Sequence, residues 1–370
     1  MFDALPPPLN SVVPFLIVLG VLVFIHELGH YLAARWRGVH VEAFSIGFGR
    51  AIASWTDKRG TVWKLSWLPL GGYVKLHGQE QPEDVDETVR AAWLPGRTFH
   101  EKSVLSRAIV IAAGPIANFL LAIVLFTGLF ATIGRPVATA ELGEIVAGSA
   151  ADRAGLQKGD VVAAIDGTAI TRFEQLRAIV STHAGKPLSL HVMRGQTALD
   201  LAVTPTTHDV GGVPTGLLGV RAGASIFEPV SAPAALWAGV AQTWDFTAQT
   251  FDGIWSMITR KASIDDLGGP VRIAQMSGQV AAMGLPSLVT FIAMLSVNLG
   301  LFNLFPIPVL DGGHLVFYLL EALRGRPLPP RAQEYGYRAG FALLLGLFVF
   351  ATWNDLGHIG LFRWLAGLIG

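Results

Sequence analysis

The sequence predicts a polytopic α-helical membrane protein with four transmembrane helices, a membrane-associated β-hairpin and an inserted β-rich domain. Of the 370 residues, 52% are hydrophobic and only 15% are charged, which is more apolar than an ordinary soluble protein. Four segments are long and apolar enough to cross a bilayer whose core is about 30 Å thick. Between the second and the third segment, the block 135–224 is polar and alternates in the manner of strands.

The predicted spans are Val12–Ala34, Ile109–Ile133, Leu288–Phe305 and Gly340–Thr352, the last of which extends back to Tyr335 if it is to reach full length. Lys and Arg are absent before the first span and frequent after it, and they recur before the second span and between the last two. By the positive-inside rule, residues 35–105 and 311–338 are cytoplasmic, and the N-terminus, residues 134–285 and the C-terminus lie on the other side. The first span lacks the flanks of a cleaved signal peptide, so we expect it to be retained.

These segments divide the chain into four parts. We expect a membrane core at 1–134, a β-rich domain at 135–224, an amphipathic region at 225–284 and a second membrane core at 285–370. The amphipathic region contains Ala232–Ile258, whose tryptophans and aspartates predict a helix lying on a membrane or protein surface.

Shorter patterns predict the β-structure. In the cytoplasmic β-element 41–76, Phe44–Gly49 and Trp63–Trp67 read as short strands, and Asp57–Gly60 is typical of a turn. The acidic stretch 80–87 is predicted to be a solvated loop. In the β-rich domain the strand patterns lie at Val161–Ile165, Leu188–Met193 and Leu199–Val203, separated by glycine-containing turns.

The first span contains the motif His26-Glu27-Leu28-Gly29-His30. On a helix the two histidines lie one turn apart on the same face, where they can bind one zinc ion, and Glu27 beside them can accept a proton from water. The alternative is a histidine pair satisfied by neighbouring side chains, but ionisable groups inside a membrane are costly and indicate a function. The chain has no cysteine, so zinc ligands must be His, Asp or Glu. Its formal net charge of zero indicates no nucleic-acid partner.

A catalytic zinc site needs a third protein ligand, for which Asp311 is the candidate. It follows Pro306 and Pro308, which end the third span and leave backbone free to line a cavity. Asp311 and His26 both lie near cytoplasmic span ends, hence at similar depth. An ordinary turn with Asp at a loop position is the alternative, and His314 is a rival ligand.

The chain resembles the site-2 proteases, the intramembrane zinc metalloproteases, and within them the bacterial RseP-type branch. The resemblance rests on His26–His30, on Phe44–Gly49 with Leu70–Lys75, on Gly114–Asn118, on Gly268–Val271, and on Asn298–Gly313. It implies that His26, His30 and Asp311 bind Zn²⁺, that Glu27 is general base and then general acid, and that Asn303 holds the substrate peptide or polarises its carbonyl. For Asn118 we expect packing or a helix-to-helix hydrogen bond rather than catalysis.

The resemblance also implies partners. The substrates would be single-span membrane proteins, such as anti-sigma factors or signal-peptide remnants, cut after an upstream site-1-type protease has trimmed their outer part. The location would be the lipid bilayer of a bacterial inner membrane, with the active site toward the cytoplasmic side. The β-element would enter the membrane beside the active site and pair with an unwound substrate segment, the alternative being a plain cytoplasmic hairpin.

Within 135–224, the stretch Ser149–Val162 followed by Ile165-Asp166-Gly167 resembles a PDZ domain of bacterial proteases. We expect this domain on the periplasmic side, where it binds protein tails or acts as a size filter. Only one such domain is expected, whereas some relatives carry two. Two other functions stay open for the chain: a catalytically inactive PDZ-bearing membrane scaffold, which the intact motif residues disfavour, and a metal-binding transporter, for which no inverted repeat is visible.

Overall fold

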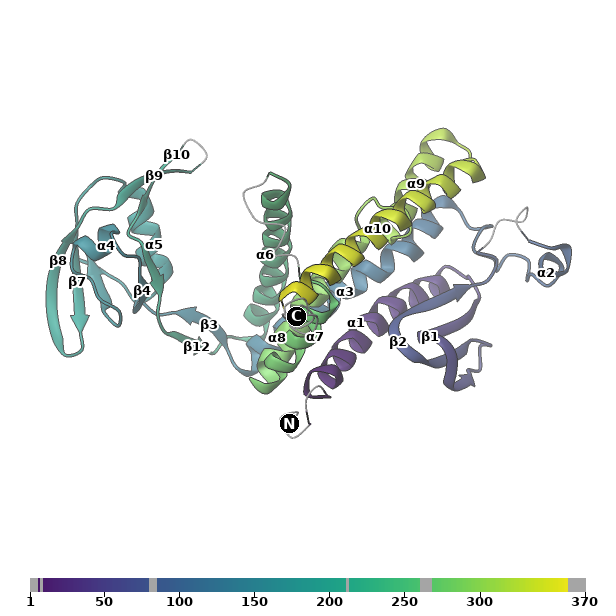
Figure 1. The fold of residues 1–370 in the computed structure, drawn as a ribbon, viewed down its shortest axis with the longest axis horizontal. Coiled ribbons are helices and arrows are strands. Elements are labelled where there is room, and N and C mark those ends of the chain that lie inside the picture. The colour runs from purple at the N-terminus through teal and green to yellow at the C-terminus, as the bar shows by residue number, and fades with distance from the viewer. Residues whose placement is uncertain (1–5, 7–8, 80–84, 211–212, 260–267, 359–370) are drawn as a thin grey trace, which may run out of the picture. The chain divides into compact units, whose positions relative to one another are not determined.

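The computed structural model describes residues 6, 9–79, 85–210, 213–259 and 268–358 (Figure 1). The chain divides into two compact units: unit 1 contains Met1–Leu129 and Leu236–Gly370, and unit 2 contains Phe130–Ala235. Of the acidic stretch 80–87 that we predicted as a solvated loop, residues 80–84 lie outside the described residues.

Unit 1 consists of long helices and one β-hairpin. In chain order its elements are α1 (Leu9–Trp36), β1 (Val41–Thr56), β2 (Val62–Leu76), α2 (Glu87–Ala91), α3 (Val104–Thr132), α6 (Ala232–Ile258), α7 (Pro270–Ala282), α8 (Leu285–Asn303), α9 (Asp311–Arg324) and α10 (Pro330–His358). The last residues of α3 and the first of α6 belong to unit 2.

Within the described residues, four helices are long and apolar enough to cross a membrane: α1, α3, α8 and α10. They correspond to the four predicted spans. The first three helices differ from the predicted bounds by one to five residues at each end, and α10 extends further than predicted at both ends. We expected the third span to reach Phe305, yet α8 ends at Asn303, shortly before Pro306. The fourth helix is much longer than Gly340–Thr352, because helical hydrogen bonds continue through the polar flank that contains Arg331 and Glu334.

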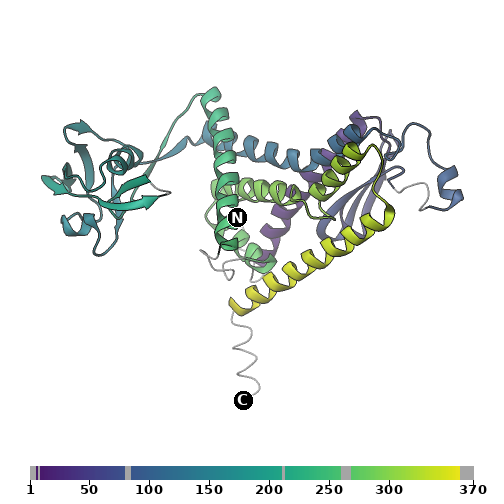
Figure 2. The same ribbon diagram turned by 90° about the horizontal axis from the view of Figure 1, so that it is seen from above.

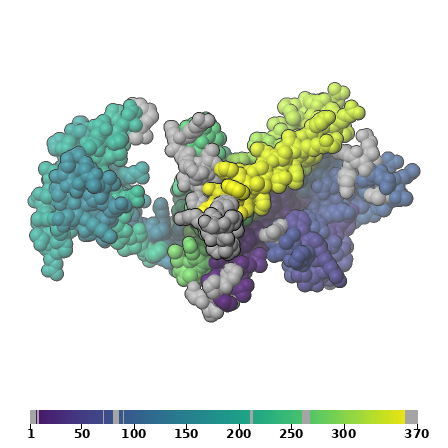
Figure 3. All heavy atoms as spheres, viewed as in Figure 1, coloured from purple at the N-terminus to yellow at the C-terminus, as the bar shows by residue number. Residues whose placement is uncertain are grey.

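The end of α10 is held by a polar contact that hydropathy does not reveal. Asp355 is only 2% exposed, and its carboxylate accepts hydrogen bonds from the backbone N–H groups of Gly269, Val271 and Arg272 at 2.9–3.0 Å. These donors belong to the unpaired N-terminus of α7. The Gly268–Val271 motif therefore serves as the attachment point of α10, which runs along one side of unit 1 in Figures 2 and 3.

The β1–β2 hairpin is longer than the two short strands we predicted. The turn at Asp57–Gly60 is confirmed, since Gly60 has φ +85° and Asp57 Oδ1 accepts from two backbone N–H groups of the turn. The ladder is irregular, because Ala43–Ile46 of β1 pairs both with Val62–Leu65 and with Gly72–Lys75 of β2. At the base of the hairpin, Phe44 is buried and stacks on Trp63 with ring centroids 4.4 Å apart.

Unit 2 is a small β-rich body with two short helices. Its elements are β3 (Arg135–Ala138), β4 (Leu142–Ile145), α4 (Ala150–Arg153), β5 (Val161–Ile165), β6 (Thr168–Ala169), α5 (Phe173–Thr182), β7 (Leu188–Arg194), β8 (Thr197–Val203), β9 (Thr206–Val210), β10 (Val213–Leu217), β11 (Val220–Ala222) and β12 (Ser225–Glu228). The three predicted strand patterns are confirmed as β5, β7 and β8. They form a sheet in the order β6-β5-β7-β8, and β9–β10, β4–β11 and β3–β12 pair as antiparallel ribbons.

A buried carboxylate links the sheet of unit 2 to the turn before β5. Both carboxylate oxygens of Asp160 accept hydrogen bonds from Arg194 at 2.8 Å, and one also accepts from the backbone N–H of Gln157. The hydrogen bonds from Arg194 outweigh the opposing effect of burial and hold the pKa of Asp160 below its usual range. The core beneath this sheet contains Leu142, Ile165 and Leu190, each at most 1% exposed.

Candidate metal centre

Two histidines of α1 face the same point inside unit 1. His26 and His30 lie one turn apart, each is 8% exposed, and their Nε2 atoms are 3.2 Å apart. The third member comes from the other end of the chain: Asp311 is the first residue of α9. Its Oδ2 lies 3.1 Å from His26 Nε2 and 3.5 Å from His30 Nε2.

These three atoms have the spacing that a zinc ion requires. Ligands held about 2.0–2.1 Å from a tetrahedral zinc are about 3.3 Å apart, close to the separations observed here. Oδ2 of Asp311 is buried, and in the described part of the chain no hydrogen bond satisfies it. Among the described residues, these three form a metal-sized cluster, in which all the ligand atoms lie within 4.8 Å of one another. Two imidazoles and a carboxylate whose Oδ2 has no hydrogen-bond partner among the described residues therefore fit a zinc ion.

The loop between α8 and α9 brings Asp311 to the histidines. Pro306 and Pro308 prevent the helix from continuing, and Val309 adopts φ +93°, which is rare for a branched residue. Gly312 and Gly313 then lie directly against the backbone of this loop, where a Cβ would collide with the carbonyl groups of Leu304, Phe305 and Ile307. The loop and the first turn of α9 are thus packed backbone to backbone.

Helix α3 supports both imidazoles from behind. Val110, Gly114 and Asn118 are spaced by four residues and share one helix face. The carbonyl of Val110 accepts the Nδ1 proton of His30 at 2.9 Å, which turns the Nε2 lone pair toward the cluster. Gly114 leaves room for the rings, and the amide of Asn118 lies 3.1 Å from Nδ1 of His26.

Sequence reasoning missed the support from Val110 and Gly114. For Asn118 we expected packing or a helix-to-helix hydrogen bond, and its contact with His26 of α1 is a hydrogen bond of that kind. The four-residue spacing of Gly114 and Asn118, which matches the spacing of the two histidines on α1, is the signal that could have placed these two residues beside the rings. Val110 contributes only its backbone carbonyl, which no sequence signal marks.

Glu27 lies between α1 and the hairpin. A Cβ at Gly72 of β2 would be 3.2 Å from Glu27 Cγ, so the strand passes close to the side chain. The backbone of Val74, two residues further along β2, also lies near the Glu27 carboxylate. The acid next to the metal ligands is therefore in contact with the β-element.

Two other predicted residues lie differently. The amide of Asn303 donates a hydrogen bond to the carbonyl of Leu299 in its own helix at 2.9 Å. His314, the rival ligand, has its Nδ1 beside the carbonyl of Leu310 at 3.1 Å and its ring packed on Tyr337. Of the two candidates for the third ligand position, it is Asp311 that lies within 3.5 Å of both histidines.

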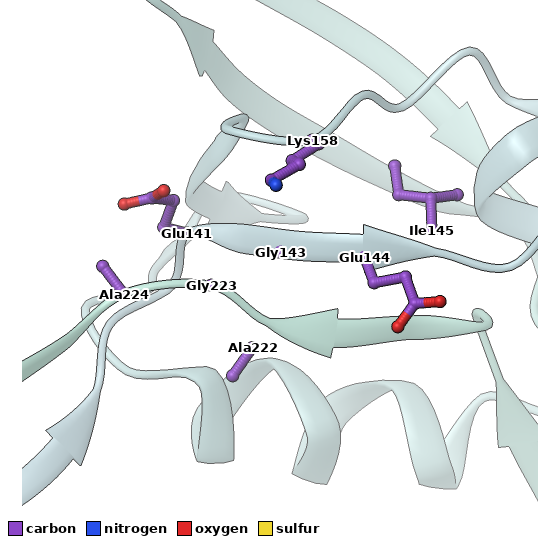
Figure 4. A pocket seen from close by; sticks show the side chains of 8 residues that line it. All are labelled: Glu141, Gly143, Glu144, Ile145, Lys158, Ala222, Gly223 and Ala224. Atoms are coloured by element: carbon purple, nitrogen blue, oxygen red, sulfur yellow. The ribbon is translucent and has the colours of Figure 1, made fainter. Parts of the chain in front are cut away.

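Unit 2 has an open hollow of its own, with a volume of about 780 Å³. Figure 4 shows Lys158 and Ile145 on one side of β4 and Glu144 on the other. The remaining lining residues are Glu141, Gly143, Ala222, Gly223 and Ala224. The hollow contains no residue of the metal-sized cluster, so we assign the chemistry to the cluster in unit 1.

Comparison with known proteins identifies the family of the chain. The model of peptidase family M50 matches residues 14–347, which include both histidines and Asp311. The chain belongs to peptidase family M50. This family is that of the site-2 proteases, so the resemblance noted in the sequence is confirmed, and the chain is a zinc metalloprotease.

The M50 relatives are similar over nearly their whole lengths. A protein of Agrobacterium fabrum named "Putative zinc metalloprotease Atu1380" is 44% identical over 361 residues, covering 94% of this chain and 96% of the relative. Metalloprotease MmpA of Caulobacter vibrioides is 38% identical, covering 97% of this chain and 98% of its own. The regulator of sigma E protease of Salmonella typhi is 31% identical, covering 93% of this chain and 98% of the relative.

Proposed function

We propose that this M50 metalloprotease is an intramembrane endopeptidase that cleaves the transmembrane segments of single-span membrane proteins. The observation that carries the proposal is the meeting of His26, His30 and Asp311, which come from two segments 281 positions apart and whose ligand atoms lie within 3.5 Å of one another. The histidines belong to a helix apolar enough to cross a membrane. A hydrolytic site at this place acts on peptide bonds inside the bilayer.

The three residues would hold the zinc ion, and Glu27 would carry the proton. Bound zinc supplies Lewis acidity to the scissile carbonyl and to a water molecule. Glu27 takes one proton from the attacking water and delivers it to the amine of the departing peptide. Asn303 is the last residue of α8, eight residues before Asp311. Once its hydrogen bond to the carbonyl of Leu299 is broken, its amide would hydrogen-bond the substrate backbone.

The β1–β2 hairpin would hold the substrate extended. A transmembrane helix hides its carbonyl groups in its own hydrogen bonds, so it must unwind before hydrolysis. Ala43–Ile46 of β1 already pairs on both sides, with Val62–Leu65 and with Gly72–Lys75 of β2, so a further strand would pair at an outer edge of this sheet. Support for this role comes from the contact of β2 with Glu27, since a strand added there would pass the proton carrier.

The remaining assignments follow the RseP-type relatives. We propose that the chain resides in a bacterial inner membrane with its active site toward the cytoplasm. Unit 2 would be a PDZ domain on the periplasmic side, either binding protein tails or filtering substrates by size. Suitable substrates are anti-sigma factors or signal-peptide remnants that an upstream site-1-type protease has already shortened.

The proposal is tested by cleavage of a tagged single-span protein by the purified full chain in liposomes. We compare wild type with Glu27→Gln and measure bound zinc in both. Wild type should release product, and the variant should be about 10²–10⁴-fold slower, the usual contribution of a general acid–base, while keeping its zinc. Zinc-loaded wild type that cleaves none of several shortened substrates would overturn the proposal and favour a PDZ-bearing scaffold.

A further inference from the structure

Asn118 occupies an unusual position behind the metal centre. It is fully buried in α3, and its amide faces Nδ1 of His26 at 3.1 Å. Its side-chain oxygen is buried, and among the described residues it has no hydrogen-bond partner. Among the described residues, the one hydrogen-bond partner of this buried amide is the candidate ligand His26. The amide orientation therefore depends on which nitrogen of His26 carries the proton.

The direction of this hydrogen bond determines what His26 can bind. If the NH₂ group of Asn118 donates to Nδ1, the proton of a neutral imidazole is on Nε2, and that nitrogen cannot ligate a metal. If the amide is turned by 180°, its oxygen accepts the Nδ1 proton, and the Nε2 lone pair points at Asp311 and His30. The amide oxygen and nitrogen are nearly isosteric, so both orientations fit the same space.

We propose that Asn118 is a positioning residue for the zinc site, in which its side-chain oxygen accepts the Nδ1 proton of His26 and so reserves Nε2 for the metal. The inference rests on the proposed zinc ligands. It matches the arrangement on the next turn, where the carbonyl of Val110 accepts from His30. Helix α3 would thus set the tautomer of both imidazoles. The backbone carbonyl of Val110 would do so for His30, and the side chain of Asn118, which can be substituted, would do so for His26.

The place of Asn118 in the helix packing is fixed by other contacts. Its backbone carbonyl accepts a hydrogen bond from Ser296 Oγ of α8 at 2.8 Å, and its Cβ lies 3.3 Å from where a Cβ at Gly300 would be. These contacts hold α3 against α8 without using the amide. Ser296→Ala is therefore a matched control, because it perturbs the same buried contact and leaves the amide in place.

The test measures zinc affinity of the purified full chain by competition with a chromogenic chelator, without any substrate. Asn118→Leu has similar size but cannot accept a proton, so its zinc affinity should fall about 10–100-fold, as is usual when the outer partner of a ligating histidine is lost. Asn118→Asp retains an acceptor and should bind zinc within a few-fold of wild type. Ser296→Ala should also bind like wild type.

If Asn118 served only in packing, the zinc affinities of the two variants would have the opposite order, because a buried pocket accepts Leu and rejects a carboxylate. Equal affinity in Asn118→Leu and wild type, or a tenfold or greater loss confined to Asn118→Asp, would therefore overturn the inference. If the Leu variant does not fold, the Asp variant decides alone. A wild-type protein that binds no zinc would instead refute the proposed metal site, so the two failures are distinguishable.

Discussion

Gly114 lies where α3 meets the two imidazoles of α1. A Cβ at this position would be 2.9 Å from Nε2 of His26 and still closer to Nε2 of His30. These nitrogens are the atoms that face Asp311. The glycine is therefore needed for space at the ligands themselves, and not for backbone conformation.

We expect Gly114→Ala to displace at least one imidazole and to lower the zinc content of the purified protein, with at least a tenfold loss of cleavage. The matched control is Gly128→Ala on the same helix, where an added Cβ meets nothing within 4 Å. Both substitutions favour the helix to the same degree. Metal analysis and cleavage of a single-span substrate provide the measurement, and wild-type zinc in Gly114→Ala would contradict the spatial argument.

At the same scale, the predictability of a residue depended on whether its signal is local. His26, Glu27 and His30 are recognisable because two candidate ligands and an acid lie within about one helical turn. Asp311 is recognisable because two prolines and two glycines surround it. Val110 contributes only a carbonyl group, which every residue has, so no sequence pattern distinguishes it.

At the scale of elements, Asp160 and Arg194 join the turn before β5 to the end of β7. The Asp160 side chain is 1% exposed, and its pKa is held down mainly by the hydrogen bonds from Arg194. A carboxyl whose pKa is lower in the folded than in the unfolded state stabilises the fold above its ordinary pKa. That stabilisation declines as the pH falls through the ordinary carboxyl range toward the folded-state pKa.

Asp160→Asn should therefore lower the stability of unit 2 by about 2 kcal/mol at pH 7, the scale of charged hydrogen bonds, and by less at pH 4. Hydrogen exchange of the β5 and β7 amides in the full chain reports the effect, after correction for the intrinsic exchange rate at each pH. Glu144→Gln is the control, because its ion pair with Arg221 is exposed and should contribute little. A loss of stability that is the same at pH 7 and pH 4 would refute the dependence on Asp160 ionisation.

Hydropathy did not predict where several helices and strands begin and end. The apolar centre of α10 was recognisable, but its true length was not, because the ends of a helix depend on backbone hydrogen bonds and on partners such as the N-terminus of α7 at Asp355. The β1–β2 strands were underestimated for a related reason. Their pairing extends beyond the segments with a clear alternation, and Gly72 allows the close approach of β2 to α1.

At the scale of the whole molecule, the metal centre connects the beginning and the end of the chain. His26 and His30 belong to α1, and Asp311 begins α9. Because the three side chains converge only in the folded state, an ion that binds them stabilises that state. With an ion bound, the site would act as a cross-link within unit 1 as well as a candidate active site.

Removing zinc with a chelator should lower the thermal unfolding midpoint of the detergent-solubilised protein, and adding zinc should restore it. At a free zinc concentration 100 times the dissociation constant, the expected stabilisation is about 2.7 kcal/mol. Asp311→Ala should show a much smaller shift on zinc addition. An equal shift in this variant would mean that the stabilising ion binds elsewhere.

The class of protein, the four apolar helices, three strands of unit 2 and the residues of the candidate metal centre could all be predicted from the sequence. These features depend on hydropathy, periodicity and short motifs, which are local. Only the tertiary structure decided that Asp311 and not His314 meets the histidines, and that α3 supports both rings. Such contacts join residues 80 to 285 positions apart, and their existence depends on how helices cross, which no local pattern encodes.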